Sequence, residues 1–418
     1  MFGHSAPRIL SVNSAHPPHS ITMSPLTRRI ILLVSILACL CIAYTAGFGA
    51  YRTWSDRRRR PSDTKAVSFG IFWEAWEYLD QYFYGDPVSP QERTYGAIRQ
   101  ALTLLDDPYT IFVEPQPHEL ERDIMRGSFG GIGVTLWRSP EGDVLISPQP
   151  DSPAERTGLL EGDLLLALDN QPLSVEMTID DVYAWLHGEV GSTITLTISR
   201  PPTPPFDVPI VRDLIYVPSI SWRVLDRDRS IGYIHIQSIT ERTNDEISLA
   251  LQELLQPLAV SGLILDLRDN SGGLLNPTVA VASQFLREGI VLTELRRDGQ
   301  ERKFPVRTGG IATEVPLIVL VNNGTASAAE IIAGAIQDHR RGLLVGETTY
   351  GKGSVQQVYD LSDGSSLHVT SAVWMTPHQH PIEGAGLMPD HLVLRGDNPA
   401  VDEQIEYAVT ILLDDLNP

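Results

Sequence analysis

The chain has 418 residues, of which 42% are hydrophobic, so it is long enough to form two or three folded units rather than one. Its formal net charge of −20 argues against nucleic acid as a partner, because binding phosphate groups requires a basic face. Both cysteines, Cys39 and Cys41, fall in one apolar segment, so the rest of the chain can form neither a disulfide bond nor a cysteine metal site.

The basic residues gather near the N-terminus. Eight of the 32 lie before Pro61, accompanied by a single acid, Asp56. The remaining 358 residues carry 24 basic and 51 acidic side chains, a net charge of −27. Self-repulsion keeps a body of this charge dispersed in solution.

The N-terminal region contains a candidate membrane segment. Residues 1–29 are rich in Ser, Pro and His and predict a disordered tail. Residues 30–50 carry no charge over 21 positions, and as a helix they would span about 31 Å, which matches the hydrocarbon core of a bilayer. We predict a transmembrane helix or signal anchor here, with a cleaved signal peptide as the alternative. Arginines flank both ends of this segment, so a count of positive charges would place the folded part of the chain in the cytoplasm. This positive-inside rule weakens for long translocated domains.

Two helices are predicted after the basic linker. Phe72, Trp76, Leu79 and Phe83 form one apolar face over residues 68–83. The second helix begins at Ser89, where a capping serine is followed by proline at the first helical position and by glutamate three residues on. It ends in Leu-Leu-Asp-Asp-Pro-Tyr-Thr at residues 104–110, a helix stop and turn.

A β-rich unit begins at the glycine-rich residues 129–136. These glycines leave backbone N–H groups open ahead of a strand, an arrangement able to hold a carboxylate. Further elements are predicted as strands at 144–146, 163–168 and 193–198 and as helical pieces at 153–157 and 178–186. This order resembles a PDZ domain of the type found in bacterial proteases. The resemblance implies that a chain terminus binds as an added strand, in a groove formed by Gly131, Ile132, Gly133, Val134, Val182 and Leu186.

Strands and helices alternate in the C-terminal half. The proline-rich residues 201–205 predict a stiff linker into it. The alternating elements are strand 231–236, helix 245–255, strand 263–267, helix 277–286 and strand 290–295. Such alternation indicates βαβ units and a largely parallel sheet. A last helix over 402–413 should pack on that sheet through Ile405, Ala408 and Leu412.

The residues around Ser327 suggest chemistry. An apolar strand at 317–321 and a turn at 322–325 precede a helix that runs to Asp338, so Ser327 lies at a helix N-terminus. Unpaired N–H groups and the positive dipole end favour negative charge there, so this serine can be a nucleophile with an oxyanion site beside it. The alternative is a simple N-cap. Lys352 stands between two glycines in an otherwise uncharged run, which a solvated surface lysine does not need.

Together these residues carry a family resemblance. The segment Gly324-Thr325-Ala326-Ser327-Ala328-Ala329-Glu330, with Gly351-Lys352-Gly353 and Gln356, resembles the active-site signature of the carboxyl-terminal processing peptidases, the tail-specific serine proteases of peptidase family S41. The resemblance implies that Ser327 attacks, Lys352 is the general base and Gln356 orients the lysine. It also implies the fold shared with crotonase and the Clp peptidase.

A glycine-rich turn at residues 266–273 follows the strand 263–267. The family resemblance implies that Gly273 or Gly272 donates one N–H to the oxyanion, beside the N–H of Ala328. A phosphate cradle is the alternative, but the turn lacks a Walker lysine and Rossmann glycine spacing.

The lysine must be neutral to act as a base. Its ordinary pKa is about 10.4, so a Ser–Lys pair works at neutral pH only if burial lowers the pKa. In a straight strand Lys352 and Gln356 would lie about 13 Å apart. Gly351 and Gly353 must therefore let the chain fold back.

Two other functions compete with the Ser–Lys peptidase. One is a non-catalytic, membrane-tethered PDZ adaptor with a protease-like body. The other keeps catalysis but uses a Ser–His–Asp set with His339 or His368. His378 and His380 could suggest a metal, but no further ligand is near them in sequence, so we expect neither a metal nor a cofactor.

The sequence thus predicts an α/β protease core of the ClpP/crotonase type, an inserted β-rich PDZ domain, an N-terminal helical arm and one transmembrane helix. The predicted boundaries are 1–29 for the tail, 30–51 for the membrane anchor, 52–66 for the basic linker, 67–117 for the helical region, 118–200 for the PDZ domain, 201–398 for the protease core and 399–418 for the C-terminal helix. The expected partners are proteins with apolar C-termini, a membrane and, in a homo-oligomer, further copies of the chain. The expected location of the catalytic body is extracytoplasmic.

Overall fold

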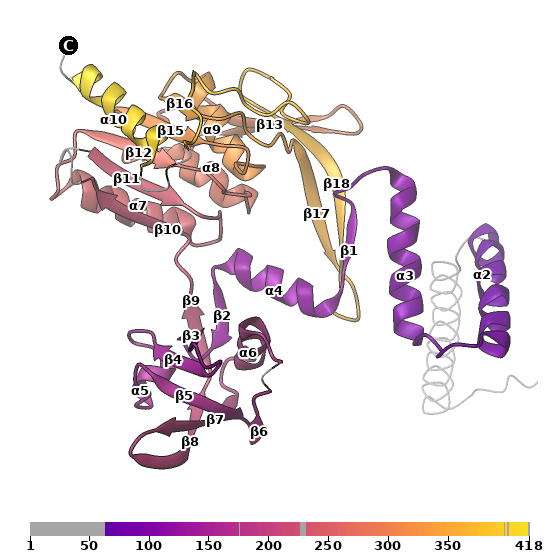
Figure 1. Ribbon diagram of the computed structural model, residues 1–418. Coiled ribbons are helices and arrows are strands. Elements are labelled where there is room, and N and C mark those ends of the chain that lie inside the picture. Colours follow the sequence, from indigo (N-terminus) through magenta and orange to yellow (C-terminus); the bar gives the residue numbers. More distant parts are fainter. Residues whose placement is uncertain (1–62, 175, 226–230, 397, 399–400, 417–418) are drawn as a thin grey trace, which may run out of the picture. The chain divides into compact units, whose positions relative to one another are not determined.

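The computed structural model describes residues 63–174, 176–225, 231–396, 398 and 401–416 (Figure 1). The chain divides into two compact units, Met1–Ser89 and Pro90–Pro418. The predicted membrane segment at 30–51 lies outside the described residues. Within the described residues, no helix is both long and apolar enough to cross a membrane.

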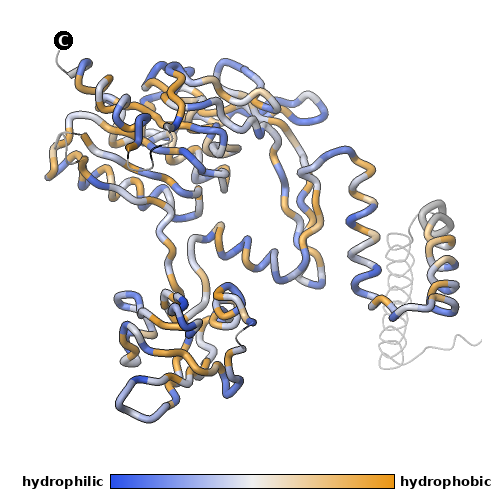
Figure 2. Tube along the Cα trace, viewed as in Figure 1, coloured by the Kyte–Doolittle hydropathy of each residue, from blue (hydrophilic) through white to orange (hydrophobic). Residues whose placement is uncertain are grey.

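The described part of the first unit is the helix α2 (Asp63–Tyr82). It confirms the helix predicted at 68–83 and begins five residues earlier. Phe72 and Trp76 are partly buried, whereas Leu79 and Phe83 are exposed. Figure 2 shows hydrophobic and hydrophilic residues interspersed along this helix.

The second unit begins with two helices and a short strand. These are α3 (Pro90–Leu102), which leads into the 3-10 turn η1 (Thr103–Leu105), then β1 (Ile111–Val113) and α4 (Pro115–Arg126). Pro90 opens α3 as predicted, because its fixed φ suits the first helical position. The rings of Tyr95 and Phe112, with centroids 4.8 Å apart, pack α3 against β1.

The predicted β-rich unit is a sheet in the order β3-β4-β5-β7-β8, with a short strand β6 beside β5. The strands are β3 (Val134–Arg138), β4 (Val144–Pro148), β5 (Asp163–Leu168), β6 (Gln171–Pro172), β7 (Thr193–Arg200) and β8 (Thr203–Val211), and the helices are α5 (Pro153–Arg156) and α6 (Ile179–Leu186). Apolar side chains of the sheet and of α6 form one buried cluster, which includes Leu136, Ile146 and Val182. The chain enters and leaves this unit through the pair β2 (Ser128–Gly131) and β9 (Asp213–Tyr216).

The predicted linker at 201–205 is wrong. Strand β8 begins at Thr203 and pairs with β7, so the proline-rich residues form the β7–β8 hairpin inside the β-rich unit. Two of these prolines, Pro204 and Pro205, lie within β8, which tolerates them because it is the edge strand of its sheet, where an N–H is not required on the open side.

The C-terminal half is built on a six-stranded sheet in the order β10-β11-β12-β15-β16-β19 (Figure 1). Its strands are β10 (Ile220–Val224), β11 (Ile231–Ile236), β12 (Gly262–Asp266), β15 (Leu317–Val321), β16 (Leu343–Gly346) and β19 (His391–Leu392), and its helices are α7 (Thr243–Leu255), α8 (Leu275–Ser283), α9 (Ala328–Asp338) and α10 (Glu403–Leu416). From β11 to β19 the neighbours are parallel, as predicted, and β10 is antiparallel to β11.

Both faces of this sheet are covered at its central strands, which explains why β12 and β15 are buried at every position. Leu263 and Leu265 pack on the side of α7, α8 and α9, whereas Ile264 between them packs on the side of α10. Successive strand residues point to opposite faces, so a strand covered on both sides must be apolar throughout. Ala408 and Leu412 of α10 are buried against the sheet, and Ile405 is partly buried, as predicted.

A second sheet is antiparallel and contains β1, β18 (Ser366–Met375), β13 (Ile290–Arg296) and β14 (Glu301–Pro305), with β17 (Ser354–Asp360) beside β18. The prediction that strand 290–295 belongs to the parallel sheet is wrong. After α8 the chain turns back into a hairpin with β14 instead of crossing over to a parallel neighbour.

Candidate active site

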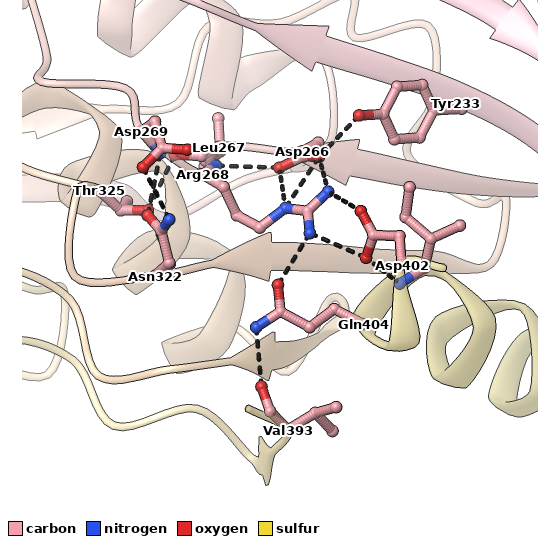
Figure 3. Close-up of polar contacts among 11 residues, drawn as sticks. Tyr233, Asp266, Leu267, Arg268, Asp269, Asn322, Thr325, Val393, Asp402 and Gln404 are labelled. Atoms are coloured by element: carbon pink, nitrogen blue, oxygen red, sulfur yellow. Dashed lines mark hydrogen bonds and ion pairs between the residues drawn. The ribbon is translucent and has the colours of Figure 1, made fainter. Parts of the chain in front are cut away.

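Ser327 lies at the junction of β15 and α9, at the carboxyl edge of the parallel sheet. Its φ of 53° and ψ of −117° are rare for a residue with a side chain, and such strain is typical of functional positions. The turn before it is held by side chains, because Thr325 Oγ1 donates to the carbonyl of Leu267 and Asn322 Nδ2 donates to Asp269 (Figure 3). Ser327 itself stays partly exposed, so its hydroxyl can be reached by a substrate.

The buried carboxylate of Glu330 joins the Ser327 turn to the Lys352 loop. One oxygen, Oε2, accepts from the backbone N–H of Ser327 at 2.8 Å and of Lys352 at 2.9 Å. The other oxygen accepts from the N–H of Gly351 and from the Thr349 hydroxyl. Because two backbone nitrogens share one oxygen atom, the backbones of Ser327 and Lys352 are neighbours although 25 residues separate them.

Lys352 is half-buried in the loop before β17. Burial lowers the pKa of the Lys352 amine, and the carboxylate of Glu383 opposes this shift. The amine lies 4.9 Å from the centre of the Tyr109 ring, which favours its charged form. Burial also raises the pKa of Tyr109 to about 12, assisted by the Tyr350 hydroxyl, so this ring is neutral at physiological pH. Gly351, with a φ of 89°, provides the turn that the sequence predicted here.

Gln356 is not hydrogen-bonded to Lys352 in this structure. Its Nε2 atom donates to the Ser354 hydroxyl at 3.0 Å and to the Thr370 hydroxyl at 3.3 Å. A register shift between Val355 and Gln356 interrupts the pairing of β17 with β18 at this point. Neither bond uses the side-chain oxygen of Gln356, which is the atom that would accept a hydrogen bond from the lysine amine.

The glycine turn after β12 lies against Ser327. A Cβ atom added to Gly272 would come within 2.9 Å of the Ser327 Cβ and 3.0 Å of the Ala328 nitrogen. The Gly272 N–H donates to Asn270 Oδ1, so it is already used. Within the described residues, neither the Gly273 N–H nor the Ala328 N–H donates a hydrogen bond. Of the two predicted glycines, Gly273 is therefore the one whose N–H is not already used by another described residue.

The histidines considered as alternative bases lie elsewhere. His339 follows the C-terminal end of α9, whereas Ser327 precedes its N-terminal end, so about 16 Å of helix separates them. His368 in β18 faces Glu121 of α4 at 3.4 Å. His378 and His380 are exposed beside Asp338, with nitrogen–oxygen distances of 3.5 and 3.6 Å.

The residues of the predicted peptide groove lie on β2, β3 and α6 and in the turn between β2 and β3. Ile132, Val134, Val182 and Leu186 are all buried and belong to one core cluster of this domain. Gly133 adopts a positive φ of 71°, and Gly131 ends β2 ahead of it. Strand β3 is an edge strand, and its Leu136 N–H donates to the Tyr183 hydroxyl of α6 at 2.8 Å.

Comparisons with known proteins agree with this arrangement. Residues 230–393 match the profile of peptidase family S41, and residues 144–200 match that of a PDZ domain. The carboxy-terminal-processing protease of Bartonella bacilliformis is 35% identical over 326 residues, which cover 77% of this chain and 73% of the relative. The carboxyl-terminal-processing protease of Synechocystis is 35% identical over 323 residues, which cover 76% of this chain and 75% of the relative. The solved photosystem II D1 C-terminal processing protease is 32% identical, with coverage of 76% and 86% and a TM-score of 0.45.

These matches define the class of protein as a serine-type peptidase with an inserted PDZ domain. The chain belongs to peptidase family S41, among the carboxyl-terminal processing proteases, and it carries a PDZ domain.

The role of Glu330 was not predicted from the sequence, although Ser327 and Glu330 have the spacing of a capping box. That spacing accounts for the bond from the Ser327 N–H. The bonds from Gly351 and Lys352 come from a loop more than 20 residues away, which no local pattern reveals.

Proposed function

We propose that this protein cleaves peptide bonds near the C-terminus of its substrates through a Ser327–Lys352 pair. The observation that carries the proposal is the shared carboxylate of Glu330, which fixes the nucleophile turn and the lysine loop side by side. The lowered pKa of Lys352 supports it, because a neutral amine can accept a proton.

The reaction follows from the positions of these groups. The Ser327 hydroxyl gives its proton to the Lys352 amine as its oxygen attacks the peptide carbonyl. The N–H groups of Gly273 and Ala328 stabilise the negative oxygen of the tetrahedral intermediate. The ammonium then protonates the leaving amine, and an acyl-enzyme remains. Water, deprotonated by the neutral amine, hydrolyses the acyl-enzyme and frees Ser327.

Gln356 is proposed to position the amine, as the family resemblance implies. In this role the Gln356 Oε1 atom would accept from the Lys352 amine, while its Nε2 atom donates to Ser354 and Thr370. Gln356→Ala should therefore reduce kcat more than it raises KM, because positioning matters most in the transition state.

The PDZ domain is proposed to bind the apolar C-terminus of the substrate by adding it to the edge of β3. We also propose that residues 30–51 anchor the protein to a membrane, with the catalytic body outside the cytoplasm and further copies of the chain as possible oligomer partners. A protease-like adaptor without catalysis is the second candidate.

One experiment distinguishes the two candidates. The full-length chain is incubated with an unfolded reporter protein that has an apolar C-terminus, and the products are mapped by mass spectrometry. Ser327→Ala and Lys352→Met should each lower kcat/KM by about 10⁴-fold or more while peptide binding persists. Binding without cleavage by the wild type would support the adaptor. Full activity of Lys352→Met would exclude the lysine as the base.

A further inference from the structure

A histidine–carboxylate cluster lies outside the candidate active site. His118 and Glu121 lie one helical turn apart on α4, so their side chains share a face. His368 of β18 approaches them from the neighbouring sheet. One ligand atom from each of the three residues lies within 4.8 Å of the other two.

Two ring nitrogens in this cluster are buried without a hydrogen-bond partner. Within the described residues, these atoms are Nδ1 of His118 and Nε2 of His368. The Glu121 Oε2 atom lies 3.4 Å from His368 Nε2 but without hydrogen-bond geometry. His118 is only 3% exposed, and buried polar atoms in native proteins nearly always have a partner. Both nitrogens are therefore buried without the polar partner that a buried nitrogen normally has.

The other nitrogen of His118 is fixed by a carboxylate. His118 Nε2 lies 2.7 Å from Asp360 Oδ1 of β17. A proton held on Nε2 leaves a lone pair on Nδ1. Metal-binding histidines typically use this arrangement, in which an outer carboxylate sets the tautomer and orients the ring.

We propose that His118, Glu121 and His368 bind a divalent transition-metal ion, with Zn²⁺ as the best fit. Two imidazoles and one carboxylate are a common zinc donor set, and a water molecule can complete the tetrahedron. Zinc bonds of about 2.0–2.2 Å place tetrahedral ligand atoms about 3.3 Å apart. The Glu121–His368 separation already matches this spacing. Rotamer changes that shorten the other separations by up to about 1.5 Å would complete the set.

The ion would attach α4 to the β17–β18 hairpin. Helix α4 has His118 as its only buried residue, so apolar packing does little to hold it there. Figure 2 shows this helix as mostly hydrophilic. Since α4 runs directly into β2, at the base of the PDZ domain, the metal would fix the element from which that domain extends.

The test uses the full-length chain without a histidine tag, titrated with Co²⁺ as a spectroscopic probe and then with Zn²⁺ in competition. The wild type should bind one equivalent of Co²⁺ with the visible absorption of a tetrahedral site, and Zn²⁺ should abolish that absorption. Asp360→Asn should weaken binding about 10–100-fold, as expected for an outer carboxylate. His118→Gln and Glu121→Gln should weaken it more than Asp360→Asn does.

Two controls keep the result interpretable. Glu121 is half-exposed, so Glu121→Gln should fold even if the substitution of buried His118 does not, and circular dichroism checks both. The double variant His378→Gln/His380→Gln removes the exposed histidine pair and should bind Co²⁺ as the wild type does. Zn²⁺ should also slow hydrogen exchange in residues 115–126 of the wild type but not of Glu121→Gln.

The proposal fails if the wild type binds no more Co²⁺ than Glu121→Gln does. It also fails if the double variant at His378 and His380 loses the tetrahedral signal. Neither readout depends on proteolysis, so a failure of the metal-site proposal can be distinguished from a failure of the proposed function.

Discussion

Glu330 shows how one buried side chain can connect two catalytic candidates. Its carboxylate receives three backbone N–H groups and one hydroxyl, so its charge is distributed over four hydrogen bonds. Because the acceptor is ionic, each bond is stronger than a neutral one. The negative charge is held by backbone N–H groups and not by the Lys352 amine, so the amine does not depend on Glu330 as an ion-pair partner.

The carboxylate that does act on Lys352 is Glu383. Its charge raises the pKa of the amine against the effect of burial, and its Oε2 accepts from the Gly353 N–H at 2.8 Å. In Glu383→Gln the amide oxygen can still accept that bond, but the negative charge is gone. The pKa of Lys352 should therefore fall further.

A lower lysine pKa extends activity to lower pH, because the base must be neutral. The acidic limb of kcat/KM against pH should move to lower pH in Glu383→Gln, with little loss at the plateau. Glu141→Gln, which removes an exposed carboxylate in the β3–β4 turn, should leave the profile unchanged. A shift to higher pH, or none, would mean that the limb does not report the neutral form of Lys352.

At the residue scale the sequence identifies candidate residues but not their contacts. Ser327 and Lys352 stand out because a strand-to-helix turn and a glycine-flanked lysine are local patterns. The hydrogen bonds of Gln356 are not local, since Thr370 reaches it from the neighbouring strand. The assignment of Gly273 over Gly272 depends on Asn270, whose side chain takes the Gly272 N–H.

Helix α10 illustrates how an element is attached by polar as well as apolar contacts. Arg268 lies between Asp266 of β12, at 2.5 Å, and Asp402 just before α10, at 2.9 Å (Figure 3). Burial alone would lower the pKa of Arg268, but hydrogen bonds to Asp266 and Asp402 raise it. Gln404 extends the network, accepting from Arg268 and donating to the Val393 carbonyl.

Removing the central cation should be much more damaging than removing one outer partner. Arg268→Met leaves Asp266 buried without its counter-ion and should lower the free energy of unfolding by about 3–5 kcal/mol. Asp402 is about one-third exposed, so Asp402→Asn should cost about 1 kcal/mol or less. Urea unfolding followed by circular dichroism measures both.

Arg287→Met is the matched control for this pair of variants. Arg287 pairs with Glu314 on the surface, where both side chains are well exposed, so its loss should change stability little. If Arg268→Met were as stable as Arg287→Met, the buried network would not be holding α10.

The elements themselves were largely predictable, because apolar periodicity depends on which faces are covered. The strands β12 and β15 are buried at every position, and their apolar runs in the sequence indicate this burial. The sheet to which a strand belongs is not encoded in this way. Strand β13 begins with a similar apolar run over residues 290–292, yet it pairs with β14 and β18 in an antiparallel sheet. The prolines at 201–205 predict a linker, but an edge strand tolerates the same residues, and they lie in the β7–β8 hairpin.

The whole molecule combines a candidate cleavage site with a PDZ domain, to which we have assigned, as a proposal, the binding of substrate C-termini. Under that proposal, the contacts on the open edge of β3 affect how a substrate is captured. An added strand would pair with the open edge of β3. The Leu136 N–H on that edge is taken by the Tyr183 hydroxyl. In this structure an incoming C-terminus must therefore displace Tyr183 before it can pair fully with β3.

Tyr183→Phe should tighten the binding of a peptide with an apolar C-terminus, because the Leu136 N–H becomes free without loss of the ring. The gain should be about 1 kcal/mol, or roughly fivefold in Kd, the net value of one hydrogen bond. Fluorescence anisotropy with a labelled peptide measures it, and Tyr359→Phe, an exposed tyrosine of β17, is the control. If affinity falls instead, Tyr183 contacts the peptide directly and does not compete with it.

The same variant also tests how peptide binding and cleavage are coupled. A lower KM at constant kcat would mean that the PDZ domain only captures substrate. A change in kcat would mean that a peptide bound to the PDZ domain alters the candidate site at Ser327.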